Sequence, residues 1–173
     1  MNYHISRRNY KRYTKKIYNL SISFLALIVG YNKLSAEITK VKEAEDIYLI
    51  YYKDYQYLNR AIEKIDNILE KNSDNIEALI LLSHVWLTYG DVVTKDTNEK
   101  LNAYEKGRDI AKKAVELSPK NPDAHFWYIA NTGRWGQTKG VLRSLFLVPK
   151  IKEELNLILQ INNPVASYRE FSS

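Results

Sequence analysis

The chain has 173 residues, no cysteine and a formal net charge of +6, so it is long enough for one domain with a sizeable core and holds no disulfide. The charge excess is confined to one end. Seven of the 26 basic residues lie in residues 1–36, which contain no acidic residue, and the remainder is close to neutral. A nucleic-acid-binding protein keeps a basic patch on its folded part, so this distribution argues against nucleic acid as a partner.

Residues 1–36 have the order of a secretory signal peptide: a basic segment to Lys16, an apolar segment over 17–31, and a small-residue end at Ala36. The apolar run is shorter than the ~20 residues of a membrane-spanning helix. We expect cleavage after Ala36 and a periplasmic or secreted protein. Two alternatives stay open: residues 17–31 are retained as an anchor in the inner membrane, or the leader is an amphipathic segment that stays in the cytosol.

Residues 41–57 are predicted to form a helical lead-in. Apolar and aromatic side chains recur there at three- and four-residue spacings, namely Ala44, Ile47, Tyr48, Tyr51, Tyr52 and Tyr55. Such a tyrosine stripe could be a platform for a ligand. We favour core and core rim, because a tyrosine ring buries a large area and has one polar tip to satisfy.

One helical pattern then occurs three times. Apolar or small residues at i, i+4, i+7 and i+8 form the stripes Ala61, Ile65, Ile68, Leu69; Gly107, Ala111, Ala114, Val115; and Ile151, Leu155, Ile158, Leu159. A second helix repeats as well, with Ala78, Leu82, Tyr89, Gly90 matching Ala124, Tyr128, Trp135, Gly136. We expect the glycines to end these helices and the stripes to be buried against one another.

The repeats predict an all-α domain over 37–173, a short α-solenoid of antiparallel helix pairs. The expected units are 42–75, 76–121 and 122–163, with a truncated further helix from 164. The four prolines, Pro119, Pro122, Pro149 and Pro164, are expected at helix junctions, where a missing N–H costs least.

The pattern resembles the tetratricopeptide repeat (TPR). Ala78, Leu82, Trp86 and Gly90 occupy the places of its first helix, and Gly107, Ala114 and Pro119 those of its second. A TPR unit has 34 residues, and the units of this chain are longer. Their additional residues lie in long connectors between the helices, at 91–106 and 137–150. Asp96 is predicted to cap a long second helix. In the next connector Val141, Leu142, Leu145 and Phe146 are predicted to form a small apolar helix, with Pro149 opening the following one.

The long connectors and the stretch from Lys106 to Gly140 are similar to exported TPR proteins, the T-components of TRAP transporters. The regulators of microtubule dynamics share a similar turn and HFWY-like segment. The resemblance to the T-components implies a periplasmic, non-enzymatic accessory of a solute-binding protein and its transporter subunits, in a family where some members oligomerise.

Six residues are candidate contacts for a ligand or partner: His84, Asn131, Arg134, Trp135, Lys139 and Arg143. His84 holds a place that faces the concave groove in TPR folds. The others surround the end of one helix, where Trp and Arg could concentrate binding energy and Arg could take a carboxylate by two parallel bonds; alternatively, Trp135 and Gly136 only close the helix. The segment 141–148 is a candidate exposed apolar patch, or it roofs the core.

No sequence feature indicates catalysis, a cofactor or a metal: the two histidines of the mature part, His84 and His125, have no Cys or HxxxH partner. We expect His125 to cap a helix or line a packing face. The expected function is therefore a non-enzymatic TPR scaffold or adaptor for a protein partner, possibly as a homo-oligomer and plausibly beside a TRAP-type transporter. The alternatives are a membrane-tethered assembly protein and a binder of small organic acids or lipids.

Overall fold

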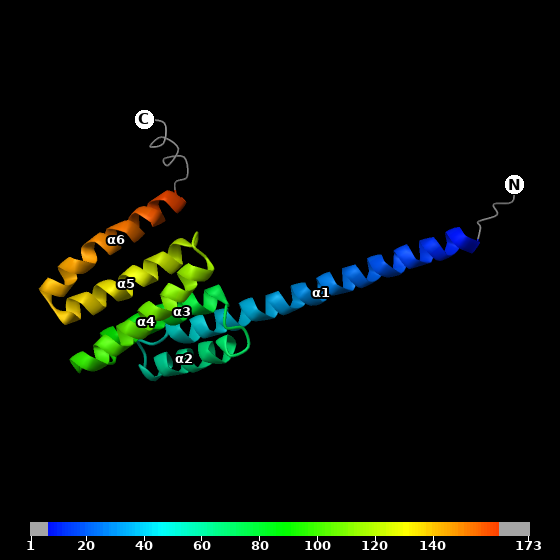
Figure 1. Cartoon of the computed structure of the whole chain (residues 1–173). Helices are drawn as coiled ribbons and strands as arrows, with labels where there is room; N and C mark the ends of the chain where they lie inside the picture. The colour runs from blue at the N-terminus through cyan, green and yellow to red at the C-terminus, as the bar shows by residue number, and fades with distance from the viewer. Residues whose placement is uncertain (1–6, 163–173) are drawn as a thin grey trace, which may run out of the picture. The chain divides into compact units, whose positions relative to one another are not determined.

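The computed structural model describes the backbone of residues 7–162 and the side chains of residues 23–162. This part of the chain is built from α-helices, without strands, and the all-α prediction is confirmed. In chain order the helices are α1 (Arg7–Leu49), α2 (Gln56–Leu69), α3 (Ile76–Val92), α4 (Thr97–Leu117), α5 (Pro122–Lys139) and α6 (Val141–Asn162) (Figure 1). The further helix predicted from residue 164 lies outside the described residues.

The chain divides into two compact units by its contacts, 1–40 and 41–173. In the first unit α1 carries exposed apolar side chains, among them Phe24, Leu25 and Val29. A search of the helices in the described region finds none with the length and apolarity that crossing a bilayer requires. Ala36 lies within α1, and cleavage after it stays a prediction.

The second unit has the architecture of a solenoid. Helices α2 to α6 pack in sequence, each against the next, and α3 also packs against α5 (Figure 1). Contact between the first helices of successive pairs is what stacked repeats require, because each pair buries its apolar stripe on its neighbours. The predicted solenoid-like arrangement is therefore confirmed.

Side-chain caps fix where three of the helices begin. Asn75, Asp96 and Asn121 are extended residues whose side-chain oxygens accept backbone N–H groups of the first turns of α3, α4 and α5. Each cap satisfies donors that have no partner within the helix. The prediction that Asp96 starts a long helix is confirmed, and Pro122 stands in the first turn of α5, where its missing N–H is harmless.

Two of the three predicted stripes are buried. In α2, Ala61 and Ile65 are fully buried together with Ala44 and Tyr48 from the end of α1, and in α4 Ala111 and Ala114 are fully buried. Tyr52 and Tyr55 are exposed, so the tyrosine stripe supplies core and rim as predicted. Its helix ends earlier than predicted, at Leu49, and a turn precedes α2.

The third stripe is predicted wrongly: Leu155 is 45% exposed and Leu159 is 66% exposed. Ile151 and Ile158 of the same stripe are half-buried, so only one edge of the stripe faces the neighbouring helix. Among the described helices α6 packs only on α5. The face it presents follows steps of three and four, through Leu147, Ile151 and Glu154.

Gly90 and Gly136 do not end their helices, contrary to the prediction. Both lie inside, in α3 and α5 respectively, and Gly140, with φ of 110°, is the residue that ends α5. The two buried glycines make room instead: a Cβ at Gly90 would lie 2.5 Å from the Tyr104 ring, and one at Gly136 2.5 Å from Leu147. They let neighbouring helices approach closely.

Pro149 does not open a helix either. Helix α6 runs without interruption from Val141 to Asn162, with Pro149 inside it. The separate short helix predicted before Pro149 is therefore wrong. Proline removes one helical hydrogen bond, to the carbonyl four residues earlier. That residue, Leu145, is 61% exposed, so its carbonyl lies on the side of α6 that water reaches.

Candidate binding site

Three of the six candidate residues meet at the junction of α5 and α6. The Trp135 ring has the Lys139 ammonium 5.5 Å from its centroid and the Arg143 guanidinium at 5.9 Å, and Arg108 of α4 contributes a third cation at 5.5 Å. Cations at these distances are attracted by the ring's π-electrons. We call these four residues the Trp135 cluster. Sequence reasoning missed Arg108, because only the packing of α4 on α5 brings it there.

Arg134 lies in the same turn but points to a different partner. Its guanidinium is 2.7 Å from the Asp91 carboxylate, which also accepts a hydrogen bond from the Tyr104 hydroxyl at 2.7 Å. The hydrogen bond from Arg134 to Asp91 raises the pKa of Arg134. Burial is the main cause that raises the pKa of Tyr104 to about 12, and the hydrogen bond to Asp91 is the second. Arg134 therefore ties α5 to α3, and its charge is already paired.

Asn131, another of the candidate contact residues, is fully buried. Its amide nitrogen donates to the Ser83 hydroxyl at 3.0 Å and to the Trp127 carbonyl at 2.9 Å. Its amide oxygen has no hydrogen-bond partner and faces Gly107 of α4. The residue therefore locks α5 to α3 and α4 inside the solenoid, because a buried amide needs its partners.

His84 lies apart from the Trp135 cluster. Its ring is stacked on Trp127 of α5, with centroids 3.7 Å apart, and its Nε2 atom is 2.7 Å from the Tyr48 hydroxyl. Burial lowers the pKa of His84 to about 4, although Glu45 acts in the opposite direction. The imidazole is therefore neutral at physiological pH and joins α1, α3 and α5.

A cavity of about 320 Å³ opens beside this ring stack. Its lining includes His84 and Trp127 together with three carboxylate side chains, Glu45, Glu77 and Asp123. His84 does line a cavity, as expected for a groove contact, but its Nε2 atom is already engaged by Tyr48. Whether it touches a partner stays a prediction.

The first two turns of α6 carry an exposed apolar patch. Val141, Leu142, Leu145 and Phe146 are 79%, 76%, 61% and 78% exposed. The prediction of an exposed patch at 141–148 is confirmed, and the alternative that the segment roofs the core is wrong. Arg143 lies within the same turns, so the patch adjoins the Trp135 cluster. Scattered single apolar residues are ordinary on a surface, whereas a contiguous group marks a site of interaction.

A buried ion pair holds α6 to α5. Glu154 and His125 are each less than 5% exposed, with His125 Nδ1 2.5 Å from the Glu154 carboxylate, and Lys150 binds the same carboxylate at 2.9 Å. Burial raises the pKa of Glu154, but the hydrogen bonds and charges of Lys150 and His125 outweigh it, so the pKa is lowered. The second ring nitrogen of His125 lies 2.9 Å from the Pro119 carbonyl, and His125 lines a packing face as predicted.

No group of three or more metal-binding side chains occurs within the described part of the chain. What the surface offers is a Trp ring surrounded by cations, a neighbouring apolar patch and shallow cavities between helices. These features lie on the surface of an all-helical, solenoid-like domain.

Comparison with known protein families places this domain more narrowly. The sequence profile of the regulator of microtubule dynamics protein 1-3 family matches residues 41–168, most of the chain. The chain belongs to this family. A search of curated proteins finds no match.

Proposed function

We propose that the protein is a non-enzymatic, TPR-like binding module that holds a protein partner against the junction of α5 and α6. The observation that carries the proposal is the exposed apolar patch of α6 beside the Trp135 cluster. A solenoid ordinarily closes with a polar outer face, because its last repeat has no neighbour to cover it. The last helix described in this chain is apolar on that face.

The chemistry of the surface indicates the kind of partner. Lys139 and Arg143 form no ion pair within the residues that the structure describes, so an acidic group can approach both. The four apolar side chains of the patch would each contribute about 1.5–3 kcal/mol if a partner buried them fully. A partner segment that carries both acidic and apolar side chains satisfies both features. Trp and Arg side chains that become buried in an interface often contribute most of the binding energy.

Two settings remain for this module. The leader and the resemblance to T-components favour an exported accessory of a solute transporter. N-terminal sequencing of the protein isolated from cells tests this setting. A start at Glu37 supports export, and an intact leader favours the alternative of a membrane-tethered protein. The family's name favours microtubules as the partner, and the cationic Trp135 cluster fits a negatively charged surface. Co-sedimentation with microtubules tests that setting.

A photo-crosslinking residue at Phe146, in the full chain made by its own cells, tests the proposal directly. We expect one dominant protein adduct, which is lost when Lys139→Glu and Arg143→Glu are added. A crosslinker at Lys112, exposed on α4, is the matched control and should give no such adduct. An adduct with a second copy of the chain would show a homo-oligomer, and absence of any Phe146-specific adduct would refute the proposal.

A further inference from the structure

A second cavity lies where the chain departs from a standard repeat. Its volume is about 290 Å³, and it opens between α3 and the first half of α4. Thr94 belongs to the connection between these helices, and Glu99 and Asn102 belong to the early turns of α4. These turns fall in 91–106, the segment that lengthens the unit beyond 34 residues. The extra residues therefore supply much of the lining.

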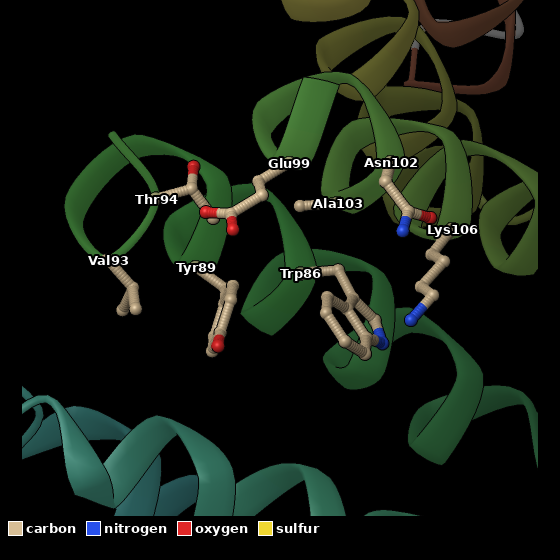
Figure 2. A pocket seen from close by; sticks show the side chains of 8 residues that line it. All are labelled: Trp86, Tyr89, Val93, Thr94, Glu99, Asn102, Ala103 and Lys106. Atoms are coloured by element: carbon tan, nitrogen blue, oxygen red, sulfur yellow. The ribbon is translucent and has the colours of Figure 1, made fainter. Parts of the chain in front are cut away.

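Two stripes of side chains form the walls. On α4, Glu99, Asn102, Ala103 and Lys106 follow the spacing i, i+3, i+4, i+7, so all four lie on one face. Opposite them Trp86 and Tyr89 of α3 form the aromatic wall, with ring centroids 5.3 Å apart. Figure 2 shows these two rings side by side, with Glu99 above Tyr89 and Lys106 beside Trp86. The small Ala103 between the charged residues leaves room in the middle of the groove.

The two charges at the ends have opposite signs. The Lys106 ammonium is 4.4 Å from the Trp86 ring centroid, and this contact holds the ammonium at its end of the groove. Glu99 stands at the other end, near Thr94, whose hydroxyl donates to the Gly90 carbonyl. Within the described part of the chain, neither Glu99 nor Lys106 takes part in a salt bridge. Burial raises the pKa of Asp66 of α2, and the Lys106 charge lies near enough to act against that rise. No ion pair among the described residues holds either end of the groove, however, so both charges can meet a ligand.

We infer that this groove binds a short zwitterionic peptide, with its ammonium at Glu99, its carboxylate at Lys106 and an apolar side chain against Trp86 and Tyr89. A purely anionic ligand would be repelled by Glu99, and a purely cationic one by Lys106. The length follows from the helix: seven residues at 1.5 Å each separate the backbone positions of Glu99 and Lys106 by about 10 Å. An extended tripeptide at about 3.3 Å per residue spans the same distance.

The probe is the tripeptide Ala-Phe-Ala with free termini, titrated into the full chain and followed by NMR shifts of the Trp86 and Tyr89 rings. Acetylating its N-terminus removes the ammonium, and amidating its C-terminus removes the carboxylate. Exposed ion pairs contribute up to about 1 kcal/mol each, so each modification should weaken binding about threefold to fivefold. Blocking both termini should weaken binding further.

Two exposed substitutions assign each charge to its partner. Glu99→Gln should abolish the preference for a free N-terminus and keep the preference for a free C-terminus, and Lys106→Gln should do the reverse. Glu105→Gln and Lys112→Gln, on the same helix but outside the groove, are controls that should preserve both preferences. Equal affinity of the wild-type chain for free and doubly blocked peptide, shifts confined to other residues, or absence of binding would each overturn the inference. The photo-crosslinking result at Phe146 does not bear on it.

Discussion

Single glycines decide how closely the helices of this chain approach one another. Gly107 of α4 lies directly under the buried Asn131 amide, so close that a Cβ there would overlap the amide. The sequence pattern identified Gly107 as a small residue of a buried stripe but could not identify its neighbour. That neighbour is on α5, and its place near the end of that helix, beside Arg134 and Trp135, led to the prediction that it contacts a partner.

Replacing Gly107→Ala should lower the free energy of unfolding by about 1–3 kcal/mol, because the new methyl group must displace a hydrogen-bonded, buried side chain. Gly133→Ala is the matched control. A Cβ at Gly133 has nothing within 4 Å, and alanine favours a helix interior over glycine by about 0.5–1 kcal/mol. Urea unfolding measures both variants. A Gly107→Ala protein as stable as the Gly133→Ala protein would contradict this close packing of α4 on α5.

His84 should make the stability depend on pH. Its pKa is about 4 in the folded protein, whereas the ordinary value for histidine is 6.5, and burial is the main cause of the difference. Between these two values the unfolded chain therefore binds a proton more readily than the folded protein does. The contribution of His84 to stability is complete above pH 6.5 and is lost as the pH falls toward 4.

The comparison of wild type with His84→Gln isolates this effect from the carboxylates. Unfolding midpoints measured at several pH values between about 7.5 and about 4.5 should fall more steeply for the wild type than for the variant. Parallel curves for the two proteins would show that the ring is accessible to protons in the folded state.

At the scale of elements, α6 combines an outer face that is apolar with an inner face whose most deeply buried residue is charged. Binary patterning assigns charged residues to the outside and apolar ones to the inside, and here it misplaced Leu155 and Leu159, which are exposed. Glu154 is buried because His125 and Lys150 satisfy its oxygens, and a carboxylate so paired can leave water. The partners come from different turns and helices, so no local pattern reveals them.

Glu154→Ala should lower the free energy of unfolding by about 3–5 kcal/mol, the range for breaking a buried ion pair at one partner, because His125 then lies buried without its carboxylate. Glu153→Ala is the control, since the Glu153 side chain is 62% exposed and surface substitutions change stability by about 0.5 kcal/mol or less. Circular dichroism during urea unfolding measures the difference. Equal losses in the two variants would show that the ion pair does not hold α6 in place.

At the scale of the whole molecule, the solenoid is held by contacts between successive helices. Helix α3 packs against α2, α4 and α5 and also contacts Tyr48 of α1, whereas α6, among the described helices, packs against α5 alone. Stability in such stacks is roughly a sum of repeats and interfaces, so ends open before the middle.

Amide hydrogen exchange should reveal this order. We expect the amides of α6 to exchange fastest among α3 to α6, and those of α3 and α4 to exchange slowest, because local opening follows the number of packed neighbours. Mass spectrometry of peptides from each helix measures the rates. Protection of α6 equal to that of α3 would indicate that a second copy or another molecule covers its outer face.

The amino-acid sequence by itself determined the helical class, the stacking of helix pairs and the Asp96 cap. These depend on spacing along one helix and on local side-chain to backbone bonds. Tertiary structure alone decided which face of α6 is buried, why the glycines stand inside α3 and α5, and which cations surround Trp135. Each of those depends on atoms from two or three helices meeting in space, and no periodicity within one helix contains that information.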